Sequence, residues 1–216
     1  CDKNGNFLFY TDGETLWNRN HQITPNGSKL EGGLSFGGVS STSQSSIFIP
    51  IPQDTNRYYL FSLSAQTGGT AGALYSIVDK RLDGGLGDAT SVKAVRLLNA
   101  NTTEGMTAVK DYSGCGFWLM LHLCNSNEFY AYHISDVGID TVPVISAAGA
   151  VYTDCRSNMK FAPNGSSSKN FRSSTNISQF KVIMRRVKNT LRENTEKIRI
   201  HYFEAKCICN KLYSEN

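Results

Sequence analysis

Four histidines are the side chains of this 216-residue chain best suited to metal binding or proton transfer: His21, His122, His133 and His201. A structural zinc site needs four closely arranged ligands, and a catalytic one needs three. The spacing of these histidines matches neither arrangement. We expect His122 and His133 to lie on neighbouring strands, where they could approach each other, but two ligands do not complete a site. The sequence therefore predicts no metal-ligating residue and no bound cofactor.

Six cysteines raise the question of disulfides or of a different metal site. Cys115 and Cys124 bracket one expected strand, and nine residues at about 3.3 Å each would separate them by roughly 30 Å, too far for a disulfide. Cys207 and Cys209 form a Cys-x-Cys pair without the second pair that a zinc site requires. The prediction is that the cysteines are mostly free thiols, although unpaired cysteines are uncommon in exported proteins.

The segment Asp2–Glu14, DKNGNFLFYTDGE, has the acidic and amide residues of a calcium-binding loop. An EF-hand loop needs glycine at its sixth position and a bidentate glutamate at its twelfth, and a helix must follow. Counted from Asp2, those positions hold Phe7 and Gly13, and a strand is expected next. The segment is therefore interpreted as a hairpin turn in which Asn and Gly supply positive φ angles.

Asp12, Gly13 and Trp17 are similar to the Asp-box turns of sialidase propellers, Ser-x-Asp-x-Gly-x-x-Trp, but here the aspartate directly precedes the glycine. A glycosidase also needs two positioned carboxylates. The acidic residues lie almost wholly in expected turns, and no pair of them stands out. We therefore predict no catalytic residues and no enzymatic activity, with a propeller-type glycoside-processing enzyme as the alternative.

Two segments are expected to contain four strands each. In residues 45–100 the expected strands are 45–50, Arg57–Ala65, Ala73–Val78 and Lys93–Leu98, and in residues 101–150 they are Met106–Lys110, Phe117–Leu123, Glu128–Ile134 and Pro143–Ser146. The strands Phe117–Leu123 and Glu128–Ile134 are expected to be adjacent in one sheet.

The same order of turns and strands extends to both sides of these segments. Residues 1–44 contain the expected strands Phe7–Thr11 and Thr15–Arg19, and residues 151–165 begin a fourth unit with Met159–Phe161. Four short antiparallel strands in a unit of roughly 40 to 50 residues are typical of a β-propeller. The predicted fold of 1–165 is thus all-β, with about three four-stranded blades of an incomplete ring. An all-β sandwich is the alternative.

Three runs of the sequence carry a family resemblance: DKNGNFLFYTDGETLWNRNHQITPNG, YSIVDKRLDGGLGDAT and TEGMTAVKDYSGCGFWLMLHLCNSNEFYAYHIS. Over residues 2–165 the chain resembles the N-terminal propellers of large Bacteroidota surface proteins described as gliding-motility-associated. The resemblance implies export by type IX secretion and adhesion-like modules further along the protein. It implies no catalytic residues.

The composition changes near Gly165. Residues 1–165 have a net charge of −3 and contain all the Gly and Pro, whereas 166–216 have a net charge of +7 and contain neither. Apolar residues at helical spacing predict a basic amphipathic helix over about 178–206 within a short helical or disordered tail. The tail is interpreted either as a frameshifted segment or as a genuine C-terminal one. Polyanion binding through its helix is a further alternative.

Together these features favour a non-catalytic binding or scaffolding propeller of a secreted or cell-surface bacterial protein, involved in adhesion or surface assembly. Its partner would be a surface protein or a glycan, without specific nucleic-acid binding. No run approaches the 18 or so apolar residues of a transmembrane helix. We expect the chain to be a fragment of a longer protein, and the sequence names no ligand-binding residue.

Overall fold

A computed structural model describes residues 1, 5–30, 44, 46–63, 72–153, 155–161 and 168–170. In these residues the protein is all-β, with antiparallel sheets and one short helix, α1 (Leu82–Gly85). The all-β prediction is therefore confirmed. The helix predicted at about 178–206 lies outside the described residues. None of the described helical structure is long and apolar enough to cross a membrane.

The first of two five-stranded sheets, called sheet I, lies within the unit predicted at 45–100. Its strands are β3 (Ser46–Pro50), β4 (Arg57–Leu63), β5 (Ala73–Asp79), β6 (Asp88–Ala89) and β7 (Val95–Leu98). The strands β3, β4 and β5 form an antiparallel meander, and β6 and β7 both pair with β5. The loop after β5 contains α1 and β6, which the sequence pattern did not reveal.

The second five-stranded sheet, sheet II, repeats this arrangement. Its strands are β8 (Thr102–Lys110), β9 (Phe117–Leu123), β10 (Ser126–Ser135), β11 (Gly138–Ile139) and β12 (Val144–Tyr152). Again the first three form a meander, and two strands, β11 and β12, pair with the third. The predicted pairing of 117–123 with 128–134 is confirmed, because β9 and β10 are aligned from Phe129 opposite His122 to Ile134 opposite Phe117.

Two hairpins complete the described structure. At the N-terminal side β1 (Phe9–Thr11) pairs with β2 (Leu16–Asn18), and after sheet II β13 (Met159–Phe161) pairs with β14 (Ser168–Asn170). The turn between β1 and β2 is closed by Asp12, whose Oδ1 accepts hydrogen bonds from the backbone N–H groups of Glu14 and Thr15. Asp12 thus has a local structural role in this turn.

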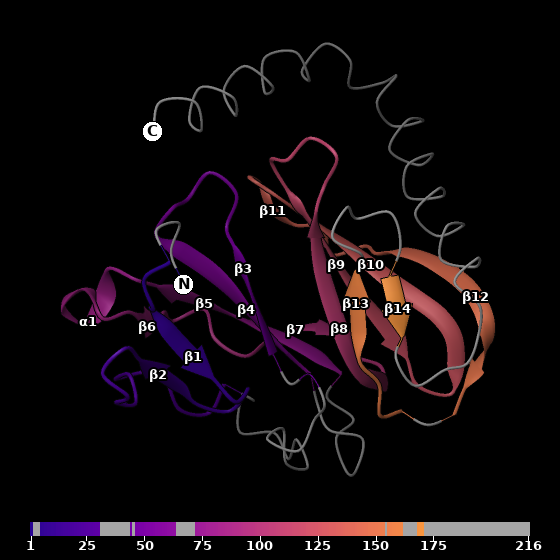
Figure 1. Ribbon diagram of the computed structural model, residues 1–216, viewed down its shortest axis with the longest axis horizontal. Coiled ribbons are helices and arrows are strands. Elements are labelled where there is room, and N and C mark those ends of the chain that lie inside the picture. The colour runs from indigo at the N-terminus through magenta and orange to yellow at the C-terminus, as the bar shows by residue number, and fades with distance from the viewer. Residues whose placement is uncertain are drawn as a thin grey trace.

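Sheets I and II pack face to face (Figure 1). Their shared core contains ten buried residues, five from each sheet: Ile49, Tyr59, Phe61, Leu63, Ala73, Met106, Leu119, Leu121, Tyr132 and Ile134. Successive side chains of a strand point to opposite faces, so the alternate positions 59, 61 and 63 of β4 all face sheet II. This interface is the main apolar contact that joins the two sheets.

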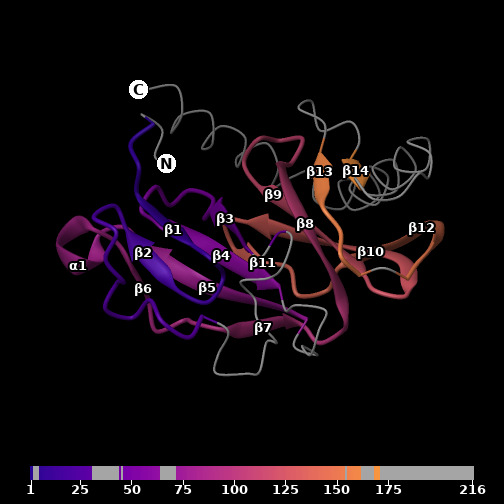
Figure 2. The same ribbon diagram turned by 60° about the horizontal axis from the view of Figure 1, so that its bottom comes forward.

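The opposite face of each sheet is covered by a hairpin (Figure 2). Leu60 and Val78 of sheet I pack against Phe9 and Leu16 of the first hairpin. On the far side, Trp118 and Phe129 of sheet II belong to a cluster with Met159 and Phe161 of β13. The layers therefore follow one another in chain order: β1–β2, sheet I, sheet II and β13–β14. Because β4 and β9 are buried on both faces, their sequences are nearly continuous apolar runs.

The prediction that the cysteines are mostly free thiols is wrong for the described residues. Cys124, in the turn after β9, and Cys155, before β13, form a disulfide with Cα atoms 5.1 Å apart. Cys1 is free and exposed. Cys124 is not paired with Cys115 across its own strand; its bridge joins segments 31 residues apart that the fold brings together. The disulfide connects sheet II to the segment that leads into the last hairpin.

Candidate functional site

A groove of about 350 Å³ opens between sheet I and the β10–β11 hairpin of sheet II. Its lining combines aromatic, aliphatic and polar side chains, among them Tyr59, Tyr75, Ile77, Arg96, Ile139 and Thr141. The volume lies within the range of about 300 to 1,000 Å³ that is typical of ligand sites. The groove continues the apolar interface of the two sheets to the surface, which makes it the strongest candidate for a binding site.

Two tyrosines on neighbouring strands form the aromatic wall of the groove. Tyr59 of β4 and Tyr75 of β5 have ring centroids 5.8 Å apart and nearly perpendicular ring planes, at 81°. Burial, together with the neighbouring Tyr75, raises the pKa of Tyr59 above its usual value of 10.0. The hydroxyl of Tyr59 therefore remains protonated at neutral pH and is able to donate a hydrogen bond to a ligand.

Arg96 lies on β7 at the rim of the groove. It is aligned with Leu74, whereas Val95 is aligned with Tyr75, so the Arg96 side chain points to the face of sheet I opposite the two tyrosines. Among the described lining residues it is the only charged one, and its side chain is exposed. Its Nη1 donates a hydrogen bond to Oδ1 of Asn99, a neutral acceptor. The described part of the chain contains no carboxylate in an ion pair with Arg96.

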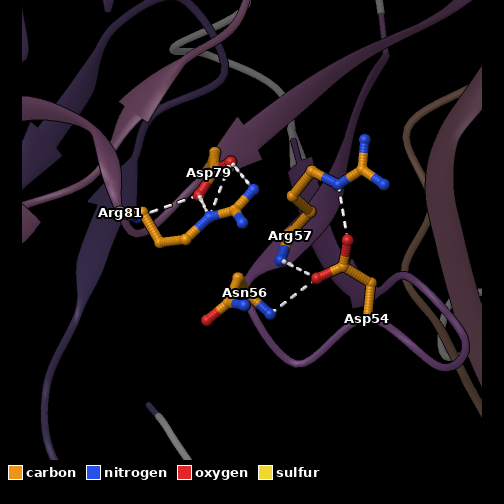
Figure 3. A network of polar contacts seen from close by, with 5 residues as sticks. All are labelled: Asp54, Asn56, Arg57, Asp79 and Arg81. Carbon is orange, nitrogen blue, oxygen red and sulfur yellow. Dashed lines mark hydrogen bonds and ion pairs between the residues drawn. The ribbon is translucent and has the colours of Figure 1, made fainter.

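A polar network lies at the edge of sheet I, where β4 begins and β5 ends (Figure 3). Asp54 accepts hydrogen bonds from the Arg57 side chain at 2.6 Å and from the backbone N–H of Asn56 at 2.8 Å. Asp79 pairs with Arg81 at 2.6 Å. The hydrogen bond from Arg81 is the largest of the effects that lower the pKa of Asp79. Each carboxylate is thus paired with a local arginine and stabilises the turn at this edge of sheet I.

His133 connects two turns of sheet II. Its Nε2 lies 3.2 Å from Oδ2 of Asp111, its Nδ1 lies 3.5 Å from Oδ2 of Asp140, and its ring packs on Trp118 at a centroid distance of 4.7 Å. Ser113 donates a hydrogen bond to Asp111 at 2.7 Å. A hydrolytic triad requires the serine to contact the histidine, whereas here both contact the aspartate. This arrangement ties the β8–β9 turn to the β10–β11 hairpin that forms one side of the groove.

We predict that Asp111→Asn lowers the free energy of unfolding by about 1 to 2 kcal/mol at pH 7. Burial raises the pKa of Asp111, but hydrogen bonds from His133, Ser113 and the backbone outweigh it and lower the pKa from 3.8 to about 2. A carboxyl group whose pKa is lower in the folded protein stabilises the fold at any pH above its pKa in the unfolded chain. This stabilisation is lost as the pH falls through its pKa in the folded protein. The measurement is urea denaturation of both proteins at several pH values.

The difference in the free energy of unfolding between wild type and Asp111→Asn should accordingly become smaller as the pH falls from about 4 towards 2. Asp140→Asn is the matched control, because the Asp140 side chain contacts the same histidine but is 58% exposed. It should change the free energy of unfolding by less than about 0.5 kcal/mol. A pH-independent effect of Asp111→Asn would contradict the role assigned to its carboxylate.

His122 and His133 lie on neighbouring strands, as predicted, but they do not approach each other. His122 lies opposite Phe129 and His133 opposite Trp118, so four residues of β10, about 13 Å, separate the two positions. Burial lowers the pKa of His122 to about 4, which keeps its ring neutral at pH 7. His201, Cys207 and Cys209 lie outside the described residues. Within the described part of the chain, no group of three or more His, Cys, Asp and Glu side chains is arranged to hold a metal.

A second surface feature is the outer face of the first hairpin. Tyr10 and Trp17 are cross-strand partners with stacked rings, and Phe7 and His21 pack beside Tyr10. Phe7 is 44% exposed and Tyr10 36% exposed. These rings point away from sheet I, which contacts Phe9 and Leu16 on the inner face. The described structure contains no element packed over them.

None of the groove residues was identified from the sequence. Alternation along β4 and β5 places 59, 75 and 77 on one face, but nothing local indicates that Arg96 and Thr141 meet there. Neither a protein-family model, nor a curated protein, nor a solved structure matches the chain. The fold and the groove thus define an all-β protein of stacked antiparallel sheets with a candidate ligand site between two of them.

Proposed function

We propose that the chain is a non-catalytic binding or scaffolding module built from β-propeller blades, which holds a surface ligand in the groove between sheets I and II. The observation that carries the proposal is the groove itself, with its two tyrosines and the aliphatic side chains beside them. Such a lining, mostly apolar with a few convergent polar groups, is suited to holding a ligand. A glycan or a surface protein is the partner that this role requires.

The packing of the sheets supports assignment of the layers as blades. In a propeller each four-stranded blade covers the faces of its two neighbours. Sheets I and II have the same meander of three strands, and a fourth strand, β7 or β12, pairs with the third in each. Their consecutive, face-to-face packing agrees with adjacent blades, and the hairpins occupy the positions of the next blades on either side. The exposed rings of Phe7 and Tyr10 would face a further blade.

The disulfide supports location outside the cytoplasm. A bond between Cys124 and Cys155 forms and persists in an oxidising compartment, whereas cytosolic thiols are kept reduced. Secretion to the cell surface, as the sequence resemblance implies, places the chain in such a compartment. Adhesion or surface assembly is then the role that we propose for the bound ligand.

The test is binding of the purified chain to a panel of neutral and acidic oligosaccharides, with release of sugar reducing ends followed in the same samples. We expect retention of at least one glycan without release of reducing ends. Tyr75→Ala should weaken retention at least tenfold, because it removes a wall of the groove. Tyr112→Ala is the matched control, since Tyr112 is 94% exposed and lies outside the groove, and it should bind like wild type.

Release of reducing ends at a rate that a single Asp→Asn change abolishes would replace the proposal with a glycosidase. Retention that is the same in Tyr75→Ala and wild type would place the ligand elsewhere on the protein. Absence of any retained glycan would refute the glycan-binding role.

A further inference from the structure

The last strand of sheet II, β12, forms one edge of that sheet (Figure 1). It pairs with β10 on one side, and the described part of the chain contains no strand that pairs with it on the other. Edge strands of natural proteins are commonly protected by charged side chains, above all lysine, or by proline. The strand β12 contains neither, and its residues Ile145 and Val151 are 50% and 57% exposed. This edge is therefore open to pairing with another strand.

The hydrogen bonds of β10 show which backbone groups of β12 face the open edge. The backbone N–H of Asp140 donates to the carbonyl of His133 at 2.9 Å, so the backbone groups of His133 point to the side of β10 on which β11 and β12 lie. Backbone groups alternate between the two sides along an antiparallel strand. Ala131 and Phe129 lie an even number of residues before His133, and their backbone groups therefore point towards β12 as well.

The residues of β12 that are aligned with Ala131 and Phe129 are Val144 and Ser146. The N–H and C=O groups of these two residues are thus used within sheet II, whereas those of Ile145 and Ala147 point away from β10. The register of β10 with β12 shifts only beyond Ala147, so the run 144–147 has regular strand geometry. Donors and acceptors that alternate at this spacing match the backbone of a further strand.

The run 144–147 is complementary to itself. When two copies are aligned antiparallel with Ser146 opposite Ser146, Ile145 of each copy lies opposite Ala147 of the other. Because both residues direct their backbone groups to the edge, each of these pairs exchanges two hydrogen bonds. The large side chain of Ile145 then lies beside the small one of Ala147, and no like charges meet. A two-fold axis between the two Ser146 residues relates the copies, which is the commonest symmetry of homodimers.

We infer that two copies of the chain associate through the β12 edge, so that sheet II continues from one copy into the other. The inference does not depend on the groove, and it adds a contact between copies to the proposed scaffolding role. The self-complementary run selects a second copy of this chain as the occupant of the edge. A contact of so few residues buries less than the roughly 1,200 to 2,000 Å² of stable complexes, so the dimer forms reversibly and at high concentration.

The experiment is sedimentation velocity of the full chain from about 1 μM to about 200 μM, a range that covers weak association. All the proteins carry Cys1→Ser, because the free thiol of Cys1 would otherwise allow disulfide-linked dimers. We expect the mean mass to rise with concentration from that of one copy towards that of two. Ala147→Pro removes a backbone N–H from the edge and should weaken dimerisation at least about tenfold.

Proline is tolerated at an edge position whose N–H faces solvent, so Ala147→Pro should leave the urea midpoint of unfolding unchanged. Ser146→Pro should instead lower this midpoint, because the N–H of Ser146 is used in the pairing with β10. Ala147→Ser is the matched control, since it keeps the backbone N–H and a small side chain, and it should dimerise like the parent. Ile145→Lys leaves the backbone unchanged but places a charge at the edge, and it should also weaken dimerisation at least about tenfold.

A mean mass of one copy over the whole concentration range would overturn the inference. Dimerisation of Ala147→Pro and Ile145→Lys with the affinity of the parent would also overturn it, because the contact would then lie elsewhere on the protein. Weakening of the dimer by Ala147→Ser to the same extent as by Ala147→Pro would contradict the role of the backbone N–H. An equal loss of stability in Ala147→Pro and Ser146→Pro would contradict the outward orientation of Ala147.

Discussion

Leu119→Ala should lower the free energy of unfolding by roughly 2 to 5 kcal/mol, a large part of the stability of a domain of this size. Leu119 is fully buried in β9, in the core that sheets I and II share. Truncation to alanine removes apolar contacts with both sheets and leaves a cavity that packed strands fill only in part. Urea denaturation followed by circular dichroism measures the loss.

Leu82→Ala makes the same chemical change at a position of α1 that is 40% exposed, and should cost less than about 1 kcal/mol. Because the core is shared, both proteins should also unfold in one transition. Two separate transitions in the wild type, or equal losses in the two variants, would show that sheets I and II do not stabilise each other.

The strands were the part of the fold that the sequence predicted well. β4 and β9 are buried on both faces, so their apolar runs stand out between polar turns. The turns beside them contain residues that adopt specific backbone conformations, such as a positive φ angle. Asn125, for example, adopts a positive φ of 55° in the two-residue turn between β9 and β10. Such local signals determine where a strand begins and ends, and they need no knowledge of the other layers.

The candidate site depends on contacts between layers, which local patterns do not encode. Arg96 and Thr141 line the same groove although they come from different sheets. The groove exists because the β10–β11 hairpin reaches over the face of sheet I, where Gln53 donates a hydrogen bond to Asp136 at 3.0 Å. The sequence pattern also does not predict the short elements α1 and β6. β6 pairs with β5 over only two residues, too few to show a strand period.

The loop before β6 also carries a constraint that only packing reveals. Gly87 has a φ of +90°, and a Cβ atom there would lie 3.0 Å from Cδ1 of Phe9 in the first hairpin. Nearby, Asp88 accepts a hydrogen bond from the backbone N–H of Asn26 at 2.9 Å. The glycines of this loop are a turn signal in the sequence. The contact of Gly87 with Phe9, which lies 78 positions earlier, follows from the stacking of β1–β2 on sheet I.

The second large effect should come from the disulfide. Cys124→Ser should lower the free energy of unfolding by about 3 to 4 kcal/mol in oxidising buffer, because a bridge that closes a loop of 31 residues restricts the unfolded chain. The bridge also holds the segment before β13 against sheet II, where the backbone N–H of Glu104 donates to the carbonyl of Cys155 at 2.8 Å. Loss of the bridge should therefore loosen the cluster of Trp118, Met159 and Phe161.

Thermal and urea denaturation with and without dithiothreitol test this prediction, and the fluorescence of Trp118 reports on the cluster. Cys1→Ser is the matched control, since Cys1 is free and exposed, and it should unfold like wild type. The double change Cys124→Ser with Cys155→Ser should cost no more than about 1 kcal/mol beyond Cys124→Ser alone, because either change removes the same bond. Cys115 is also disulfide-bonded, so reductant should lower wild-type stability at least to the level of these variants. The bridge does not form if reductant leaves the stability of the wild type unchanged and that stability equals the stability of Cys124→Ser. In that case the disulfide no longer supports a location outside the cytoplasm.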